Sequence, residues 1–393
     1  MMSYIVVLLC LVILPFALIY PLVGLLSFIW LDFCAPQALF PGPGSDVRLS
    51  IMFTVAAMVG YLLFERPKYK SATFLTPLIF CFLIWATVTT AFAQLPDFAW
   101  FKWERFAKTQ LVVLLLMIMI DSRERFELVL WTIIGALCPW IVRGFLVTLL
   151  SGGGADSVGG GAGTTFSDRN FMALVTLSSI PCALFLAKHR LLFKDVKLVT
   201  TGLHILVAFS AIMVIGSQSR GGFLAALGLI SYLGLASGRF FRSMIGVAIV
   251  AGIALFFAPE AWFDRMKTIS VNEGAEGQLN IRIRAWLYGL NIAQEFPIFG
   301  GGFGIYRLNF VPETEYGYVE SHSIYFEVLG EHGFVGLTLL LIIILSTWTK
   351  LVLLRRTLSV EPWALAVATL GKACLITVCI GSVFLHTSQQ LYF

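Results

Sequence analysis

The residues best suited to chemistry lie within and just after residues 259–321, the one long hydrophilic segment between two hydrophobic ones. His322 follows this segment and opens the next hydrophobic run. An imidazole titrates near neutral pH, so it can remove a proton from a hydroxyl group. Arg282 precedes Trp286 by one helical turn and shares a helix face with it, and Arg284 lies between them. Because guanidinium groups bind phosphate through paired hydrogen bonds, this pattern predicts an enzyme site for an anionic substrate.

A structural role is the alternative for each of these residues. A lone histidine is more often a hydrogen-bonded structural residue than a catalyst, and position alone favours His322. The segment around Trp286 is expected to form a short amphipathic helix at the membrane surface, with Ile283 and Leu287 on its apolar side. A purely structural helix would carry lysine flanks in place of two arginines, which favours a ligand role. Pro297 and the glycines after it are expected to end this helix and bend close to a ligand.

The composition requires an integral membrane protein. Hydrophobic residues make up 59% of the chain and charged residues 12%, and the mean hydropathy is +0.89, far outside the range of soluble domains. Uncharged apolar runs of about 17 to 25 residues recur, each long enough to cross a bilayer as a helix. The predicted fold is an all-α polytopic membrane protein. We expect a single integral membrane domain over residues 1–393, with residues 259–321 as a periplasmic loop or lid that contains short helices.

About 11 or 12 transmembrane helices are expected. Residues 4–34 are interrupted by Pro15 and Pro21, so they form either two short spans or one long kinked span. The first run has neither a basic leader nor a cleavage pattern and is expected to be a retained span. The remaining spans are expected at 48–64, 74–94, 106–121, 126–150, 169–187, 198–216, 220–237, 240–258, 322–349 and 362–385.

Short loops rich in lysine and arginine predict the orientation, because such loops stay in the cytoplasm. If these loops are cytoplasmic, the spans between them alternate consistently, and residues 259–321 face the periplasm. The glycine-rich loop at 151–163 and the start of the helix at Arg220 face the same side. The cytoplasmic turns are 65–70, 121–125, 188–197, 239–242 and 350–356.

Basic residues on the periplasmic side work against this rule and need another explanation. A shared anionic ligand is one, and contact of some side chains with lipid headgroups is the other. Arg220 opens an apolar helix between small residues, where a charge is costly unless it serves a site. Asn170, near the start of another expected helix, is a weaker candidate for binding a sugar or phosphate. The basic residues concerned are Arg220, Arg265, Lys267, Arg282, Arg284 and Arg307.

Several other classes of site have no support in the sequence. The net charge of +5 and the pI near 8.8 reflect topology, and no nucleic-acid-binding module is visible. No histidine, cysteine or acidic cluster has metal-ligand spacing, so no metal or cofactor is expected. The glycine-rich loop lacks the ending of a phosphate-binding loop and reads as a flexible connection. The seven cysteines lie mostly in apolar runs and are expected to be packing residues.

Three motifs occur in order along the second half of the chain. They are SRGGFLAA, an R-x-x-x-W helix followed by PIFGGGFG, and HSIYFEVLGEHGFVGL. Together they resemble the O-antigen ligase and O-antigen polymerase superfamily. The segments LPFALIYPLVGLLSFIWLDFCAPQALFPG and FSDRNFMAL are similar to its branch of exosortase-associated O-glycosylation ligases, so the resemblance covers nearly the whole chain. Singly the motifs are loose, but in this order and spacing they are specific.

The resemblance implies a metal-independent, inverting glycosyltransferase of lipopolysaccharide biosynthesis in the bacterial inner membrane, with its active site facing the periplasm. Its donor would be a glycan on undecaprenyl diphosphate, and its acceptor a sugar of the lipid A core. The family's histidine falls on His322, its arginine before an outer helix on Arg220, and its loop arginine on Arg282. Arg284 is a rival for the last role. Asn170, Trp286 and Arg307 are possible substrate-binding residues.

The chemistry of the residues agrees with this resemblance. A glycosyl diphosphate already has a good leaving group, so the site needs cations for the departing phosphates and a base for the acceptor hydroxyl. Three alternatives stay open. A polymerase would use another lipid-linked glycan as acceptor, and a protein O-oligosaccharyltransferase would use a protein. A transporter of an anionic lipid is less favoured, because the polar residues gather in one external loop.

Overall fold

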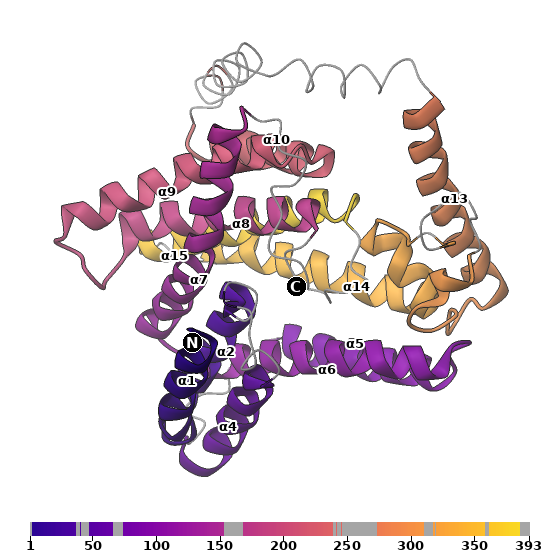
Figure 1. Ribbon diagram of the computed structural model, residues 1–393, viewed down its shortest axis with the longest axis horizontal. Helices are drawn as coiled ribbons and strands as arrows, with labels where there is room; N and C mark the ends of the chain where they lie inside the picture. Colours follow the sequence, from indigo (N-terminus) through magenta and orange to yellow (C-terminus); the bar gives the residue numbers. More distant parts are fainter. Residues whose placement is uncertain are drawn as a thin grey trace. The chain divides into compact units, whose positions relative to one another are not determined.

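The computed structural model of the chain describes residues 2–36, 40, 47–65, 74–152, 168–238, 241, 245, 273–309, 317, 318, 320–357 and 361–385. Its elements are α-helices and one short 3-10 helix, which confirms the predicted all-α class of a polytopic membrane protein (Figure 1). Five of the described helices are long and apolar enough to cross a membrane. They are α7 (Arg123–Leu150), α8 (Arg169–His189), α9 (Lys197–Gly216), α14 (Ile324–Thr357) and α15 (Pro362–Gly381).

Proline divides the first hydrophobic stretch into two helices. α1 (Met2–Ile19) ends before Tyr20, and α2 (Pro21–Cys34) begins directly after it. Pro21 occupies the first helical position, where its fixed φ fits and its missing N–H costs nothing. Pro15 stays inside α1. Residues 4–34 therefore form two short helices.

Most of the other helices begin and end close to the expected positions. α4 (Leu49–Phe64), α5 (Leu75–Ala91) and α10 (Arg220–Ala236) match the hydrophobic runs. α6 (Pro96–Met119) differs, because it begins well before the span expected at 106–121. Its first turn carries a proline and an acidic residue, which favour a helix start. Most of the span expected at 240–258, together with Arg265 and Lys267, lies outside the described residues.

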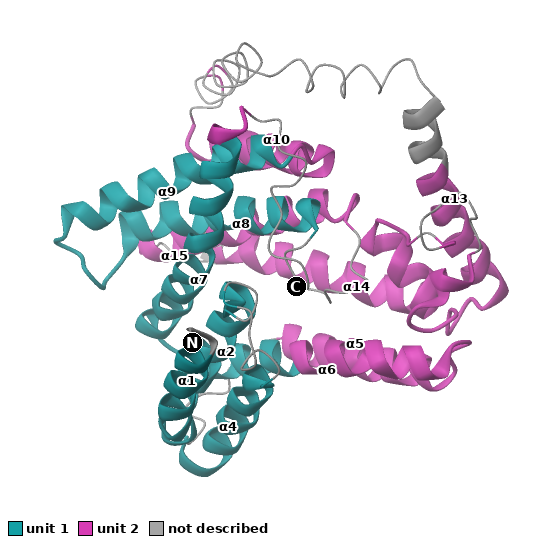
Figure 2. Cartoon of the chain, in the orientation of Figure 1, with its two compact units in different colours: residues 1–73, 111–148, 157–217 teal, residues 74–110, 149–156, 218–393 magenta. Residues whose placement is uncertain are grey.

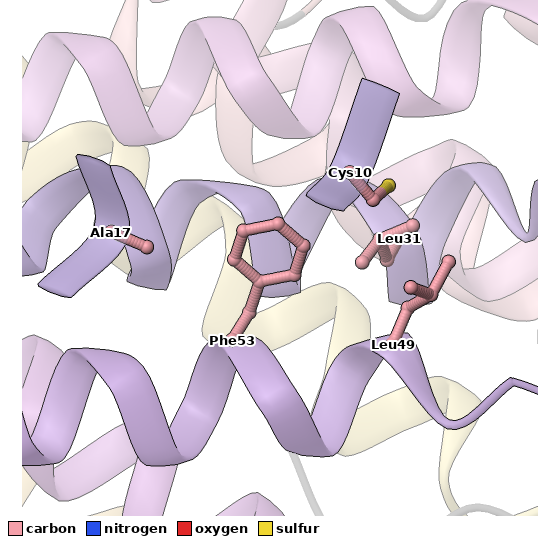
Figure 3. Packing of buried hydrophobic residues seen from close by; sticks show 5 residues of the cluster. All are labelled: Cys10, Ala17, Leu31, Leu49 and Phe53. Atoms are coloured by element: carbon pink, nitrogen blue, oxygen red, sulfur yellow. The ribbon is translucent and has the colours of Figure 1, made fainter. Parts of the chain in front are cut away.

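The chain forms two compact units that alternate along the sequence (Figure 2). Unit 1 comprises residues 1–73, 111–148 and 157–217, and unit 2 comprises residues 74–110, 149–156 and 218–393. In unit 1, α1, α2 and α4 pack against one another, and α8 packs against α9. The core of the first three helices consists of Cys10 and Ala17 of α1, Leu31 of α2, and Leu49 and Phe53 of α4 (Figure 3).

In unit 2, α14 packs against α5, α15 and α13 (Glu273–Glu295), and α10 packs against α15. Two glycines bring α10 close to α15. A Cβ atom at Gly221 would lie 2.8 Å from the Cβ of Phe384, and one at Gly228 would lie 2.3 Å from a methyl carbon of Ile380. Small residues commonly allow such close helix contacts in membranes. The start of α10 is therefore fixed against the end of α15.

α14 is broken at Gly333, which has φ 68° and ψ −170°, a conformation that is essentially restricted to glycine. The break is filled by the glycine-rich segment after α13. The amides of Gly301 and Gly302 donate to the carbonyls of Gly330 and Glu331 at 2.8 and 2.9 Å, and the amide of Phe334 donates to the carbonyl of Pro297 at 2.9 Å. The predicted end of the helix at Pro297 is confirmed, but the backbone to which these glycines come close is that of α14.

Replacing Gly333 with alanine is expected to destabilise the protein by about 2 to 4 kcal/mol. The new Cβ would lie 2.4 Å from the carbonyl oxygen of Ile298, in a backbone conformation that alanine avoids. Unfolding of the purified protein by increasing fractions of a denaturing detergent measures the change. Gly202→Ala on α9 is the control, because a Cβ there meets nothing within 4 Å. Equal stability of the Gly333→Ala protein and the control would contradict the importance of the break.

Candidate functional site

His322 lies two residues before α14 in a constrained backbone. Its φ of 49° is in the left-handed region, which few residues other than glycine adopt. The hydroxyl of Ser321 donates to the carbonyl of Ser323 at 3.0 Å, so a tight turn surrounds the histidine. The side chain of His322 is half-buried. A residue held in an uncommon conformation at the start of a helix is a candidate for a functional role.

Trp286 connects α13 to this turn. Its Nε1 donates to the carbonyl of Ser321 at 2.8 Å, and its ring stacks on Phe326 with centroids 5.0 Å apart and planes 5° apart. Arg282 lies one turn earlier on α13 and is half-buried, whereas Arg284 is exposed. Arg282 therefore shares a helix face with Trp286. That face lies beside Ser321 and Phe326, which come just before and after the histidine in the chain.

Arg220 is the first residue of α10 and is exposed. The hydroxyl of Ser219 caps this helix by accepting from the amide of Gly222 at 2.9 Å. Gln218, just before the cap, has φ 52°, so the backbone here is constrained in the same way as at His322. Arg220 and the backbone amides at the start of α10 both add positive potential, which favours an anion there.

One set of contacts joins these positions within unit 2. Gly221 packs against Phe384, which follows the end of α15. The carbonyl of Ser382, at the end of α15, accepts from the amide of Ile324 at the start of α14 at 3.0 Å. The starts of α10 and α14 therefore both adjoin the end of α15, and α13 is attached to the turn before α14. The structure places Arg220, Arg282, Trp286 and His322 on these connected segments.

The two remaining sequence candidates have other surroundings. Arg307 lies on the 3-10 helix η2 (Ile305–Leu308), where its guanidinium carbon is 3.6 Å from the ring centroid of Phe98 and 5.4 Å from that of Tyr318. Asn170 lies in unit 1, in the first turn of α8. The carboxylate of Asp168 caps that helix by accepting from the amide of Phe171 at 2.8 Å, as expected for a helix start. Asn170 stays a candidate on sequence grounds alone.

Unit 2 contains a buried group of charges that was not predicted from the sequence. The Nζ of Lys102 lies 3.2 Å from Glu331 and 3.8 Å from Glu327, and all three residues are at most 2% exposed. The amide of Gly304 also donates to Glu331, at 2.7 Å. The ammonium group and the two carboxylates therefore form one buried charge group.

This group joins three segments of unit 2. Lys102 belongs to α6, Gly304 to the glycine-rich segment, and both glutamates to the part of α14 before its break. The hydroxyl of Tyr306 adds a hydrogen bond to the carbonyl of Phe326. A signal was present in the sequence, because glutamates four residues apart share a helix face and charges in an apolar run are costly unless paired. Lys102, the partner of these two glutamates, could not be identified from the sequence.

Among the residues that the structure describes, no three histidine, cysteine or acidic side chains are grouped so that they could hold a metal ion. Comparison with known protein families finds two matches. Residues 1–191 match a family of unknown function, and residues 205–341 match the family described as O-antigen ligase. No curated protein matches the chain. All the candidates except Asn170 lie within the second matched segment.

Proposed function

Because residues 205–341 match the O-antigen ligase family, we propose that this chain transfers a preassembled glycan from undecaprenyl diphosphate to a hydroxyl of the lipid A core oligosaccharide. The transfer takes place on the periplasmic face of the bacterial inner membrane. It inverts the anomeric centre and needs no metal ion. The family match and the apolar helices support glycosyl transfer of the ligase or polymerase type by a multi-pass membrane protein.

In this proposal, Arg220 and Arg282 bind the diphosphate of the donor. Charge builds up on the diphosphate as the bond from the sugar to its oxygen breaks, and guanidinium groups stabilise that charge most strongly where little water is present. The amides at the start of α10 add to the positive potential around Arg220. Arg284, which is exposed on the same helix as the half-buried Arg282, has a supporting role in this proposal.

His322 acts as the base. It takes the proton of the acceptor hydroxyl while the hydroxyl oxygen attacks the anomeric carbon from the face opposite the diphosphate. The electron pair of the broken carbon–oxygen bond leaves with the diphosphate. The constrained turn around His322 keeps the imidazole in place, so less freedom is lost when both substrates bind. The observation that supports this proposal best is that the segments carrying Arg220, Arg282 and His322 are joined by direct contacts in unit 2.

The activity is tested with purified full-length protein in lipid nanodiscs, a glycan on undecaprenyl diphosphate, lipid A core and a metal chelator. Intact glycan on the core is the expected product. A ladder of lengthened lipid-linked glycans would show a polymerase instead. If neither product forms, protein acceptors and then movement of the lipid across the bilayer are the next assays, and a positive result in either would replace the proposal.

The two neighbouring loop arginines are expected to differ. Arg282→Gln should lower kcat/KM for transfer by about 10- to 100-fold, since it removes a charged hydrogen bond to the diphosphate. Arg284→Gln should lower it by less than about threefold, since that side chain is exposed and its pairing is weakened by water. Both proteins should unfold at the same temperature as the wild type. A larger loss from Arg284→Gln would reverse the assignment of the loop arginine.

A further inference from the structure

The first three turns of α6 carry a row of aromatic and arginine side chains, of which Phe101 and Arg105 are exposed and Phe98 is half-buried. Phe98, Phe101 and Arg105 follow one another at spacings of three and four residues, so they share a face of the helix. The guanidinium carbon of Arg105 lies 4.8 Å from the ring centroid of Phe101, and that of Arg307 lies 3.6 Å from the centroid of Phe98. We call these four residues the α6 stripe.

Both guanidinium groups of the stripe are available to an anion. Among the described residues, neither Arg105 nor Arg307 has a carboxylate within ion-pair distance, although Lys108 on the same helix is paired with Glu104. Stacking on a ring uses the flat face of a guanidinium group and leaves its N–H groups at the edge. Such a group is preorganised to bind an oxyanion through paired hydrogen bonds.

The stripe is fixed to the rest of unit 2 by buried contacts. A Cβ atom at Gly304 would lie 2.2 Å from the ring of Phe98, so the two residues are in close contact. The amide of Gly304 donates to Glu331, which also binds Lys102 on α6 itself. Because the buried side of α6 is held in this way, its exposed side keeps a fixed shape. Little order is lost when a ligand binds to a surface of this kind.

The stripe and His322 lie at similar positions along the axis of α14. Glu327, which Lys102 contacts, is only about 5 Å along the helix axis from the first residue of α14. Trp286 of α13 stacks on Phe326, whose side chain points about 100° away from that of Glu327. α6 and α13 therefore approach α14 from different sides. The predicted topology places the start of α6 on the periplasmic side, because the turn at 65–70 before α5 is cytoplasmic.

We propose that the α6 stripe is the binding surface for the acceptor saccharide, and that Arg105 and Arg307 bind an oxyanion group, such as a phosphate, on that saccharide. The inference rests on the proposed function for the role of this ligand as acceptor. Phe101 of the stripe is 53% exposed, and its ring offers a surface on which the apolar face of a sugar ring can pack. The donor diphosphate occupies Arg220 and Arg282, so the two anions bind on different segments.

Binding of the ligand without any donor is the first test. A soluble phosphorylated oligosaccharide is titrated onto the full-length protein in nanodiscs of zwitterionic lipid, and Kd is measured. Arg105→Gln and Arg307→Gln are each expected to weaken binding about tenfold or more. Lys108→Gln, which removes an equal charge from the same helix, should leave Kd unchanged. After phosphatase treatment of the saccharide, wild type and variants should bind it equally weakly.

Kinetics and lipid retention provide the second test. In the transfer assay, both arginine variants should raise KM for the phosphorylated acceptor about tenfold and leave kcat and the KM for the donor unchanged. Equal saccharide affinity in wild type and variants would overturn the proposal. The proposal would also be overturned if the variants changed only the amount of anionic phospholipid that copurifies with the protein. The stripe would then bind lipid headgroups. If wild type transfers no glycan at all, the proposed function fails, and the binding measurement still decides whether the stripe holds an anionic saccharide.

Discussion

Replacing His322 with alanine is expected to lower the rate of glycan transfer by a factor of about 10² to 10⁴. The alanine cannot take the proton of the acceptor hydroxyl, so attack on the anomeric carbon must use an uncharged and weaker nucleophile. Binding of the donor should change little, because Arg220 and Arg282 are the residues proposed to bind its diphosphate. Single-turnover measurements with donor already bound separate the chemical step from binding.

The control for this experiment is another histidine. His204 is exposed on α9, and its Nδ1 is hydrogen-bonded to the carbonyl of Thr200 one turn earlier. His204→Ala is expected to retain transfer at the rate of the wild type. Thermal unfolding of all three proteins shows whether they are folded. A folded His322→Ala protein that transfers glycan at nearly the wild-type rate would remove this residue from the mechanism.

Lys102→Met is expected to destabilise unit 2 by about 3 to 5 kcal/mol. The substitution removes the ammonium group that pairs with Glu327 and Glu331, and both carboxylates are almost fully buried. An unpaired carboxylate in such surroundings must either stay charged at a high cost or take up a proton. Resistance to unfolding by a denaturing detergent measures the loss.

Two further variants test this explanation. Lys108→Met removes an exposed pair with Glu104 and should cost less than about 0.5 kcal/mol. Adding Glu331→Gln to Lys102→Met should recover part of the stability, because one buried charge is removed with its partner. Similar losses from Lys102→Met and Lys108→Met would show that burial of the charge group is unimportant.

The membrane explains why so much of the fold could be predicted from the sequence. Every backbone polar group in a bilayer must bond within the protein, so a long apolar run has little choice but to form a helix. The exception is α6, whose start was placed too late because Lys102 and Arg105 interrupt its hydrophobic run. Lys102 is tolerated there because its charge is neutralised by Glu331, which is 229 residues away in the sequence. Hydropathy along the chain contains no information about such a partner.

The candidate site was predictable to a similar extent. His322 could be proposed from its position where a hydrophilic segment meets a hydrophobic run, and Arg282 from its spacing to Trp286. The different roles proposed for Arg282 and Arg284 rest on the exposure of each side chain, which the sequence does not show. The glycines after Pro297 were expected to approach a ligand, and the structure shows them at the break of α14. That break is local to Gly333, and nothing in the composition of an apolar run predicts it.

The hydrogen bond between Ser382 and Ile324 has a consequence for how the protein is made. Ile324 follows His322 by two residues, but its amide bonds to a residue at the end of α15, far later in the chain. α10 also packs on α15. When the ribosome has completed α14, every residue proposed for the reaction has therefore been made. The helix that joins the starts of α10 and α14 is still missing at that point. A partly synthesised chain would lack a finished site, so newly made protein would begin to consume donor only after its last described helix had entered the membrane.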